Sequence, residues 1–286
     1  MKIGVIANPF KDGAQSALLH LLNVINSQKL EAIVEDETLV ALDLSEEGIS
    51  TLPATGLAKE CDVVIVLGGD GTILDAAHRL GPSDVAVAGV NIGNLGFLSS
   101  CKDDEMELLV ESLVGATYHV VPRMLLKSTI KHVNGDVSEY FAVNEITLTR
   151  GQTGRIVAMD AFIDGDLLNH YRADGLIVAT PTGSTAYSLA AGGPLLSPKA
   201  RNIVITPICP HSLSNRSLVL TDESVVELES VESSETMTLF SVDGRSPVEV
   251  AYGGKIVVEK AAHQLHLIRL EGRSFFSTLR QKLHWG

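Results

Sequence analysis

The chain has 286 residues, of which 45% are hydrophobic and 20% charged, a composition typical of a folded globular protein of one or two domains. Its formal net charge of −13 argues against binding to nucleic acid or to anionic membranes, because the long-range field repels both. A bound anionic nucleotide would therefore need local compensation from backbone amides, a few basic side chains and a divalent cation.

The cysteines and the apolar runs bear on the cellular compartment. Cys61, Cys101 and Cys209 lie far apart and have no metal-like spacing, which favours a reduced, cytoplasmic protein. No apolar stretch is long enough to span a bilayer, and the apolar run at the start is too short for a signal peptide. We therefore expect a soluble, cytoplasmic protein with no membrane partner.

The first third of the chain alternates strand-like and helix-like stretches. Buried-strand patterns are expected at residues 2–7, 31–35, 62–67 and 85–90, and helices at residues 14–26, 73–80 and 103–114. Two Gly-rich stretches, residues 68–72 and 91–97, follow the third and fourth strands. The alternation predicts a parallel sheet covered by helices, with ligands bound at the carboxyl ends of the strands, where both Gly-rich stretches lie.

The hydrophobic period changes to two after residue 114. Strand-like runs are expected at residues 125–132, 138–149, 158–163, 167–171, 201–206, 217–220, 224–229, 236–242, 247–251, 255–260 and 264–270, and one more helix at 274–284. Asn134-Gly135-Asp136 and Asp164-Gly165 are typical of hairpin turns. This part of the chain therefore predicts an antiparallel, sandwich-like β-domain.

The pentapeptide GGDGT at residues 68–72 carries the strongest chemical signal. Glycines at the end of a buried strand let backbone amides approach phosphate oxygens, and Asp70 places a carboxylate among them. The spacing matches neither GxGxxG nor GxxxxGK[ST]. Taken alone, the segment is equally an ordinary strand-to-helix turn with Asp70 as the helix cap.

Three later segments contain residue types that bind ligands, and each also has a purely structural interpretation. The pair Asn144-Glu145 ends a strand-like run and could simply cap a turn. Arg172 and Asp174 could form a surface ion pair of little energetic value. Residues 180–194 combine glycines with hydroxyl groups, which suits a binding loop but also a flexible loop.

Together these motifs resemble one enzyme family. GGDGT after an apolar strand resembles the nucleotide-binding signature shared by NAD kinases, diacylglycerol kinases and sphingosine kinases. Residues 143–146, 172–194 and 206–213 are similar to further motifs of the ATP-dependent NAD kinase family, in the family's order and over nearly the whole chain. We therefore expect an NAD kinase.

The resemblance implies a two-domain architecture. We expect a Rossmann-like α/β nucleotide-binding domain at residues 1–100 and a β-rich, sandwich-like domain for NAD binding and oligomerisation at residues 101–270. The C-terminal helix, within residues 271–286, is expected to pack back on the first domain. The family likeness also implies a homodimer or a homotetramer.

The implied reaction transfers the γ-phosphate of ATP to the 2′-hydroxyl of the adenosine ribose of NAD, giving NADP. Asp70 is expected to be the general base. Gly68, Gly69, Gly71 and Thr72 are expected to form the phosphate cradle, together with a divalent cation, Mg²⁺, that needs no dedicated protein ligands. Inorganic polyphosphate is an alternative donor that the sequence leaves open.

The resemblance also implies a set of NAD contacts. These are Asp70, Gly71, Phe97, Asn144, Glu145, Arg155, Arg172, Asp174, Thr185, Ala186, Tyr187, Ser188, Leu189 and Ala190. Tyr187 is expected to stack on a base ring. Two positions depart from the family pattern, Asp75 where relatives often carry a basic residue and Arg245 where many carry Gln, so their contacts with substrate stay open.

Two alternative functions remain at this point. A lipid or sphingoid kinase would share GGDGT but would need an apolar substrate groove and a basic amphipathic route to the membrane, which the sequence lacks. A catalytically silent NAD(P)-binding regulator would keep the site without turnover, although the intact Asp70 argues against it.

Overall fold

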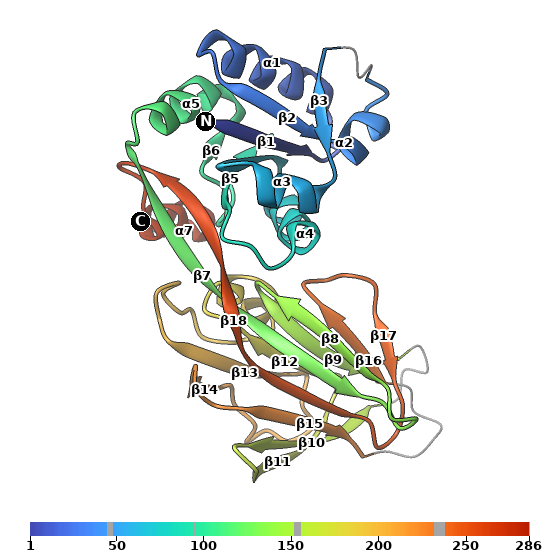
Figure 1. Ribbon diagram of the computed structural model, residues 1–286. Helices are drawn as coiled ribbons and strands as arrows, with labels where there is room; N and C mark the ends of the chain where they lie inside the picture. Colours follow the sequence, from blue (N-terminus) through green and yellow to red (C-terminus); the bar gives the residue numbers. More distant parts are fainter. Residues whose placement is uncertain (45–47, 94, 152–155, 232–237, 286) are drawn as a thin grey trace. The chain divides into compact units, whose positions relative to one another are not determined.

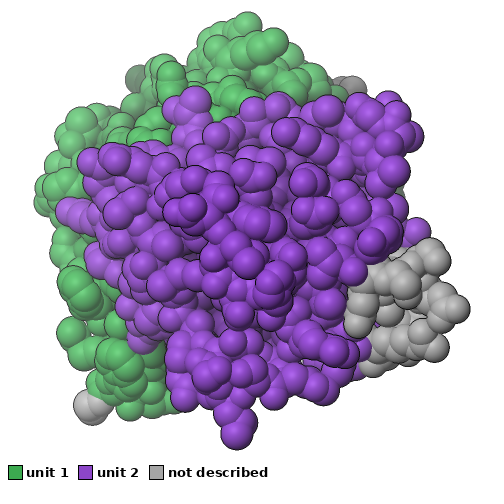
Figure 2. All heavy atoms as spheres, turned by 90° about the horizontal axis from the view of Figure 1, so that it is seen from below, with its two compact units in different colours: residues 1–123, 263–286 green, residues 124–262 purple. Residues whose placement is uncertain are grey.

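The chain forms two compact units. The computed structural model describes residues 1–44, 48–93, 95–151, 156–231 and 238–285. The first unit consists of residues 1–123 and 263–286, and the second of residues 124–262 (Figure 2). The chain leaves the first unit within β7 (Tyr118–Lys131) and returns to it within β18 (Lys255–Leu270).

The first unit is built on a parallel sheet with the strand order β3-β2-β1-β4-β5-β18 (Figure 1). Its strands are β1 (Lys2–Ala7), β2 (Glu31–Glu35), β3 (Ser50–Leu52), β4 (Val63–Gly68) and β5 (Ala86–Asn91), with the short β6 (Cys101–Lys102) also paired to β5. Every residue of β4 is buried, as expected for a central parallel strand covered on both faces.

Helices cover both faces of this sheet. They are α1 (Ala14–Ser27), α2 (Asp36–Ala41), α3 (Ala54–Glu60), α4 (Asp70–Leu80), the 3₁₀ turn η1 (Asp103–Glu105), α5 (Met106–Val114) and α7 (Phe275–Leu283). The apolar sides of α1 and α5 share one core with β1 and β4, whereas α3 and α4 pack together on the opposite face (Figure 1). None of the helices within the described ranges has the length and apolar character that crossing a membrane requires.

The division into units differs from the expected domains 1–100 and 101–270. Residues 101–123 belong to the first unit, because Met106, Leu109 and Leu113 of α5 are buried in the core formed with α1 and the sheet. Residues 263–270 also belong to the first unit, where the end of β18 pairs with β5. A period-two pattern marks a strand but does not tell which sheet it joins, and both crossings between the units, at residues 123–124 and 262–263, lie inside a single long strand.

The second unit contains two antiparallel sheets. One has the order β14-β13-β12-β9-β16-β17, and the other joins β11, β10, β15, β18, β7 and β8. The bounds are β8 (Val137–Ala142), β9 (Glu145–Arg150), β10 (Val157–Ile163), β11 (Asp166–Ala173), β12 (Gly175–Ala179), β13 (Asn202–Ile208), β14 (Leu218–Thr221), β15 (Val226–Ser230), β16 (Thr238–Val242) and β17 (Val248–Val250). The 3₁₀ turn η2 (Gly183–Thr185) and α6 (Tyr187–Ala190) follow β12.

A single apolar core joins these two sheets. Leu148 of β9, Val178 of β12 and Phe240 of β16 contribute from one sheet, and Met159 of β10 and Leu228 of β15 contribute from the other. Side chains on alternate positions of each strand therefore meet between the layers, as in a sandwich. The predicted combination of a parallel-sheet domain with an antiparallel β-domain is confirmed.

Candidate active site

The Gly-rich turn at residues 68–72 lies at the switch point of the parallel sheet. β1 and β4 are neighbours, but α1 follows β1 on one face and α4 follows β4 on the other. The connections after the two strands diverge there, and the crevice outside the strand ends is where open α/β sheets bind ligands. The two connections contact each other through Asn8, whose Nδ2 donates to Thr72 Oγ1 at 3.2 Å.

The start of α4 presents free backbone donors. The Gly69 amide donates to Thr72 Oγ1 at 3.3 Å, so this amide points into the turn. Within the described ranges, the amides of Asp70 and Gly71 have no hydrogen-bond partner, and open space surrounds the positions that a Cβ of Gly69 or Gly71 would take. Free amides at the N-terminus of a helix suit a phosphate group. The free donors of this turn are therefore the amides of Asp70 and Gly71, while Gly69 and Thr72 hold its shape.

The half-buried carboxylate of Asp70 is held by the second Gly-rich stretch. Its Oδ2 accepts from the Phe97 amide at 2.7 Å. Its Oδ1 accepts from the Leu98 amide at 3.2 Å and from the Ser99 hydroxyl at 3.3 Å. A carboxylate offers about four acceptor sites, so one more donor can still be accommodated. These contacts fix the direction of the carboxylate at the strand end.

Gly96 is required for this arrangement. A Cβ on Gly96 would lie 1.8 Å from Asp70 Oδ1, well inside van der Waals contact. Only a glycine lets residues 96–99 approach the carboxylate so closely. The Gly-rich character of residues 91–97, noticed in the sequence, thus serves the positioning of Asp70.

In the second unit, Asp243 holds the turn that carries Asn144 and Glu145. One carboxylate oxygen of Asp243 accepts from the amide of Val143 at 2.8 Å, and the other accepts from the amides of Asn144 at 2.8 Å and Glu145 at 3.0 Å. Asp243 itself has a left-handed φ of 49° and is followed by Gly244 with φ 71°. The tight turn after β16 therefore aims its carboxylate at the turn before β9.

Among the described acids of this unit, Glu145 has the most strongly shifted pKa. Its side chain is only 7% exposed, and its Oε2 has no hydrogen-bond partner within the described ranges. Burial raises the pKa of Glu145 to about 8, the negative charge of Asp243 acts in the same direction, and a hydrogen bond from the Tyr187 backbone opposes both. A buried, partnerless carboxyl oxygen is costly unless a ligand supplies the missing hydrogen bond.

The loop after β12 packs directly against this turn. Thr180 donates its hydroxyl to the Val143 carbonyl at 2.6 Å and its amide to the Asn144 carbonyl at 2.8 Å. Gly183 lies so close that a Cβ there would be 2.1 Å from the Asn144 carbonyl oxygen. The two segments that the sequence singled out, Asn144-Glu145 and residues 180–194, thus form one cluster.

The predicted contacts on this loop differ in what they can offer a ligand. Tyr187 is 43% exposed, so its ring is available for stacking, and Thr185, Ala186, Leu189 and Ala190 are partly or fully exposed. The Ser188 side chain is fully buried, and its hydroxyl pairs with Thr206 Oγ1 at 2.9 Å. The Ser188 hydroxyl is therefore already paired inside the fold.

The remaining predicted residues have varied surroundings. Asp174 pairs with Arg150 at 3.3 Å, while Arg172 and Arg245 are exposed. Asp75 pairs with Arg79 one helical turn later at 2.9 Å, so its carboxylate already has a cation. Arg155 lies outside the described residues.

Sequence reasoning did not identify several residues that build the site. Leu98 and Ser99 hold Asp70, and Thr180 and Asp243 hold the turn before Glu145. Thr180 opens the predicted loop 180–194, and Ser99 lies just beyond a Gly-rich stretch, but neither pattern indicated these hydrogen bonds. Within the described ranges, no group of three His, Cys, Asp or Glu side chains is arranged to hold a metal ion.

A carboxylate beside free amides at the switch point of a parallel sheet suits nucleotide binding and phosphoryl transfer. Two family models match the chain, the ATP-NAD kinase N-terminal domain over residues 3–118 and the ATP-NAD kinase C-terminal domain over residues 143–270. The chain belongs to the ATP-NAD kinase family. The family predicted from GGDGT and the later motifs is confirmed, and neither alternative function is favoured.

Curated relatives and solved structures agree with this assignment. The NAD kinase of Lachnoclostridium phytofermentans is 38% identical over 286 residues and covers 98% of each chain. The NAD kinase of Aeromonas salmonicida is 38% identical over 285 residues, 99% of this chain and 96% of the relative. Yeast NADH kinase complexed with NADH has a TM-score of 0.90 at 26% identity and covers 100% of this chain and 88% of the yeast chain. An NAD kinase from Archaeoglobus fulgidus in complex with ATP shares the fold, with a TM-score of 0.77 at 21% identity and 99% of each chain covered.

Proposed function

We propose that the chain transfers the γ-phosphate of ATP to the 2′-hydroxyl of the adenosine ribose of NAD, with Asp70 as the general base. The observation that carries this proposal is the Asp70 carboxylate, oriented by three donors beside the free amides of Asp70 and Gly71. A ribose hydroxyl is a weak nucleophile until a base takes its proton. Phosphoryl transfer otherwise depends on positioning and on neutralising negative charge.

In this mechanism Asp70 accepts the proton of the 2′-hydroxyl as the ribose oxygen bonds to the γ-phosphorus. The bond between the γ-phosphorus and the bridging oxygen breaks, so that ADP leaves and NADP is formed. The amides of Asp70 and Gly71 donate to phosphate oxygens at the N-terminus of α4, where the helix dipole favours negative charge.

We assign NAD binding to the residues that the sequence singled out. Glu145, with a raised pKa and a partnerless oxygen, is protonated at neutral pH and exchanges hydrogen bonds with a polar edge of NAD, while the Tyr187 ring stacks on a base. The other proposed contacts are Gly71, Phe97, Asn144, Arg155, Arg172, Asp174, Thr185, Ala186, Ser188, Leu189 and Ala190. The similarity to yeast NADH kinase complexed with NADH supports a nicotinamide dinucleotide as ligand.

The donor, the metal and the assembly complete the proposal. ATP is the donor that the family name states, and polyphosphate stays an alternative. Mg²⁺ is expected to arrive with ATP and to be held by its phosphates, as Mg²⁺ commonly is. A homodimer or homotetramer and a cytoplasmic location stay predictions, tested by light scattering and by cell fractionation.

The proposal is tested with purified protein, NAD and Mg²⁺, and with either ATP or polyphosphate as donor. NADP is detected by an NADP-specific dehydrogenase, which reports phosphorylation at the 2′ position only. NADP formed with ATP supports the proposal. A folded protein that binds NAD but makes no NADP with either donor contradicts it and favours the silent regulator.

A further inference from the structure

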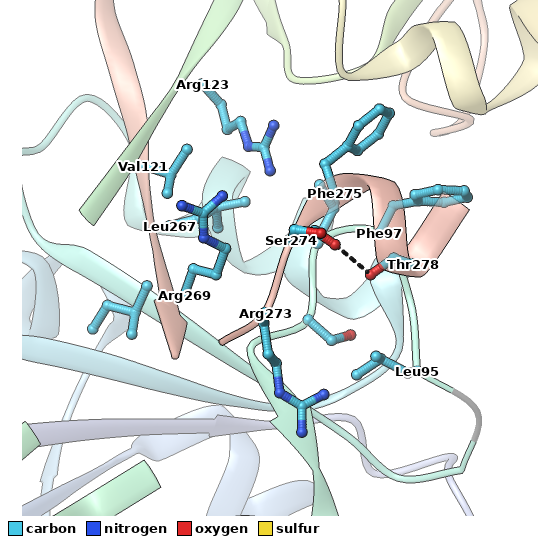
Figure 3. Close-up of a pocket in the computed structure, with 13 residues that line it drawn as sticks. Leu95, Phe97, Val121, Arg123, Leu267, Arg269, Arg273, Ser274, Phe275 and Thr278 are labelled. Carbon is cyan, nitrogen blue, oxygen red and sulfur yellow. Dashed lines mark hydrogen bonds between the residues drawn. The ribbon is translucent and has the colours of Figure 1, made fainter. Parts of the chain in front are cut away.

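The first unit contains a small cavity with several arginines in its wall, which we call the arginine pocket (Figure 3). Its volume is about 40 Å³. The lining residues are Leu95, Phe97, Leu98, Ser99, Val121, Arg123, Leu267, Ile268, Arg269, Arg273, Ser274, Phe275 and Thr278. Of these residues, only Phe97 is a predicted NAD contact. None of them belongs to the predicted phosphate cradle.

Two arginines of this pocket each have a buried nitrogen that no described residue pairs with. Arg123 is only 8% exposed, and the Nε atoms of Arg123 and Arg269 are both buried without a hydrogen-bond partner in the described part of the chain. Figure 3 draws the side chains of Arg123 and Arg269 on the same side of the pocket, as the influence of the Arg269 charge on Arg123 requires. Arg273 differs from them, because it pairs with Glu105.

The electrostatics of Arg123 and Arg269 also indicate that a counter-charge is missing. Burial and, to a smaller extent, the positive charge of Arg269 together lower the pKa of Arg123 to about 10. Burying a charge without a counter-charge is strongly unfavourable, and two like charges add repulsion. The chain has 35 acidic residues and 22 basic ones, yet no described acidic side chain pairs with Arg123 or Arg269. The missing counter-charge is therefore expected to come from a ligand.

We propose that the arginine pocket binds a phosphate-type oxyanion between the guanidinium groups of Arg123 and Arg269. A cavity of about 40 Å³ holds roughly three water-sized groups, which matches a single phosphate and excludes a whole nucleotide. Arginine forms short, charge-assisted and often bidentate hydrogen bonds to phosphate. The N-terminus of the nine-residue helix α7, at Ser274 and Phe275, also lines the cavity and favours negative charge.

The position of the pocket connects it to the catalytic carboxylate. Its wall includes Phe97, Leu98 and Ser99, the three residues that donate to Asp70. A phosphate held by Arg123 and Arg269 would thus lie against the segment that orients Asp70. The inference does not rest on the proposed kinase function, because the binding of the anion is measured without turnover.

The test is equilibrium dialysis of the full chain against radiolabelled inorganic phosphate at constant ionic strength in chloride. We expect saturable binding of one phosphate per chain in the millimolar range or tighter, displaced by sulfate. Arg123→Gln and Arg269→Gln should each weaken binding by roughly tenfold or more. Arg280→Gln, the same charge change at an exposed position of α7, should leave binding unchanged.

Stability provides a second measurement. Without phosphate, Arg123→Gln should unfold at the same temperature as the wild type or at a higher one, because an unpaired buried charge is removed; with phosphate, only the wild type should gain stability. No saturable phosphate binding to the wild type, or equal binding to Arg123→Gln and the wild type, would overturn the proposal. Asp70→Asn should still bind phosphate, which separates this site from the Gly-rich turn.

Competition identifies the source of the phosphate group. If free phosphate is the ligand, ATP and ADP should not displace the labelled phosphate. If the phosphate tail of a nucleotide or of polyphosphate enters the pocket, ATP or polyphosphate should displace the labelled phosphate. Arg123→Gln should then weaken the binding of that competitor as well. Displacement by adenosine alone would contradict a phosphate-type site.

Discussion

Asp70 in the first unit and Glu145 in the second are both carboxyl groups at strand ends, but their surroundings are opposite. Asp70 is half-buried and accepts from three donors of residues 97–99. Glu145 is almost fully buried, accepts one backbone hydrogen bond and has one oxygen without a partner in the described chain. The first is fixed in direction as an acceptor, and the second is held as a neutral acid with an unmet hydrogen bond.

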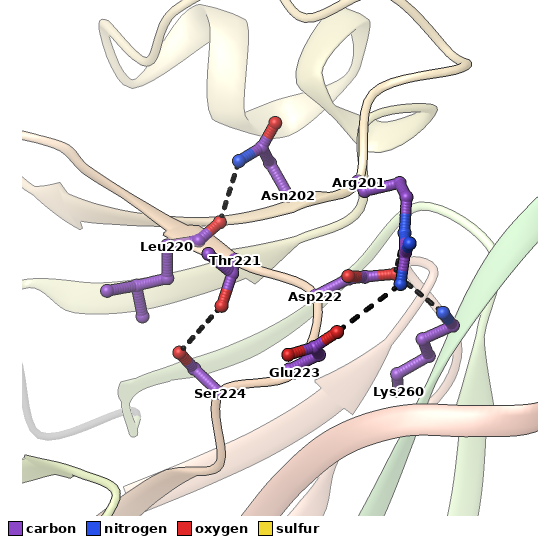
Figure 4. A network of polar contacts seen from close by, with 8 residues as sticks. All are labelled: Arg201, Asn202, Leu220, Thr221, Asp222, Glu223, Ser224 and Lys260. Atoms are coloured by element: carbon purple, nitrogen blue, oxygen red, sulfur yellow. Dashed lines mark hydrogen bonds and ion pairs between the residues drawn. The ribbon is translucent and has the colours of Figure 1, made fainter.

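This difference fits the two roles proposed here, proton removal by Asp70 and NAD binding by Glu145. A general base must be aimed at its target, and the three donors around Asp70 fix the direction of its carboxylate. A binding group contributes most to ligand affinity when the ligand forms a hydrogen bond that the free protein lacks. Glu145 Oε2 is such a group, because it has no partner among the described residues. A second network in the same unit gives the contrast: Asp222 is buried as well, but Lys260 at 2.5 Å and Arg201 at 3.3 Å pair with it (Figure 4). Asp222 is therefore structural.

The largest expected effect is that of Asp70→Asn, which keeps the shape of the side chain but removes its basicity. We expect kcat to fall on the order of 10²- to 10⁴-fold, the contribution of a general base. The matched control is Asp75→Asn on the same helix, which loses only an ion pair with Arg79 and should keep most of the activity. Equal kcat for Asp70→Asn and wild type would remove Asp70 from this role.

Gly96→Ala tests whether the direction of Asp70 matters as much as its charge. The added methyl would lie 1.8 Å from Asp70 Oδ1 and must displace the carboxylate. Because a displacement of about 1 Å can cost on the order of 10²-fold in rate, kcat should fall by that order. Gly115→Ala, whose methyl would approach no atom closer than 3.3 Å, serves as the control. An unchanged kcat for Gly96→Ala would show that the contact is dispensable.

Asp243→Asn tests whether the Asp243 carboxylate holds the turn that carries Glu145. Asp243 accepts from three amides, and an amide nitrogen in place of one oxygen would face a backbone donor. We expect a loss of about 1–3 kcal/mol in the free energy of unfolding and a higher KM for NAD. Asp166→Asn, on the exposed start of β11, should change neither quantity in urea denaturation and kinetic assays. A variant as stable as the wild type would contradict the role of Asp243.

The fourth prediction is a pH dependence of stability caused by Glu145. Burial raises the pKa of Glu145 from its ordinary value of 4.5 to about 8, so the folded chain keeps a proton that the unfolded chain releases. The free energy of unfolding should therefore fall as the pH rises from about 4.5 to 8, with a slope of up to about 1.4 kcal/mol per unit. Glu145→Gln has no proton to lose, so the difference between variant and wild type isolates this group. Parallel pH profiles would contradict the assignment.

The strand pattern of the first unit was predictable from the sequence, because buried parallel strands are continuous apolar runs. The runs at residues 31–35 and 62–67 correspond to β2 and β4. The short β3 and the helices α2 and α3 were not predicted, since a three-residue strand and helices of six and seven residues carry too little periodicity. The two strands β7 and β18 were predicted only in part, because each runs through both units.

The site was predictable where the chemistry lies within one segment. Asp70 was identified from five consecutive residues, whereas the role of Asp243 depends on hydrogen bonds to residues about a hundred positions away. The contact between Gly96 and Asp70 and the burial of Glu145 arise only when the chain folds, so neither leaves a local pattern.

The most direct test of this account compares Asp70→Asn with Glu145→Gln in two assays. NAD affinity is measured by calorimetry, and the rate of phosphoryl transfer is measured in a single turnover with saturating NAD and ATP. The account predicts that Asp70→Asn binds NAD as the wild type does but transfers phosphate far more slowly, and that Glu145→Gln mainly loses NAD affinity. If Glu145→Gln abolished transfer at saturation while Asp70→Asn lost only affinity, the two roles assigned here would be reversed.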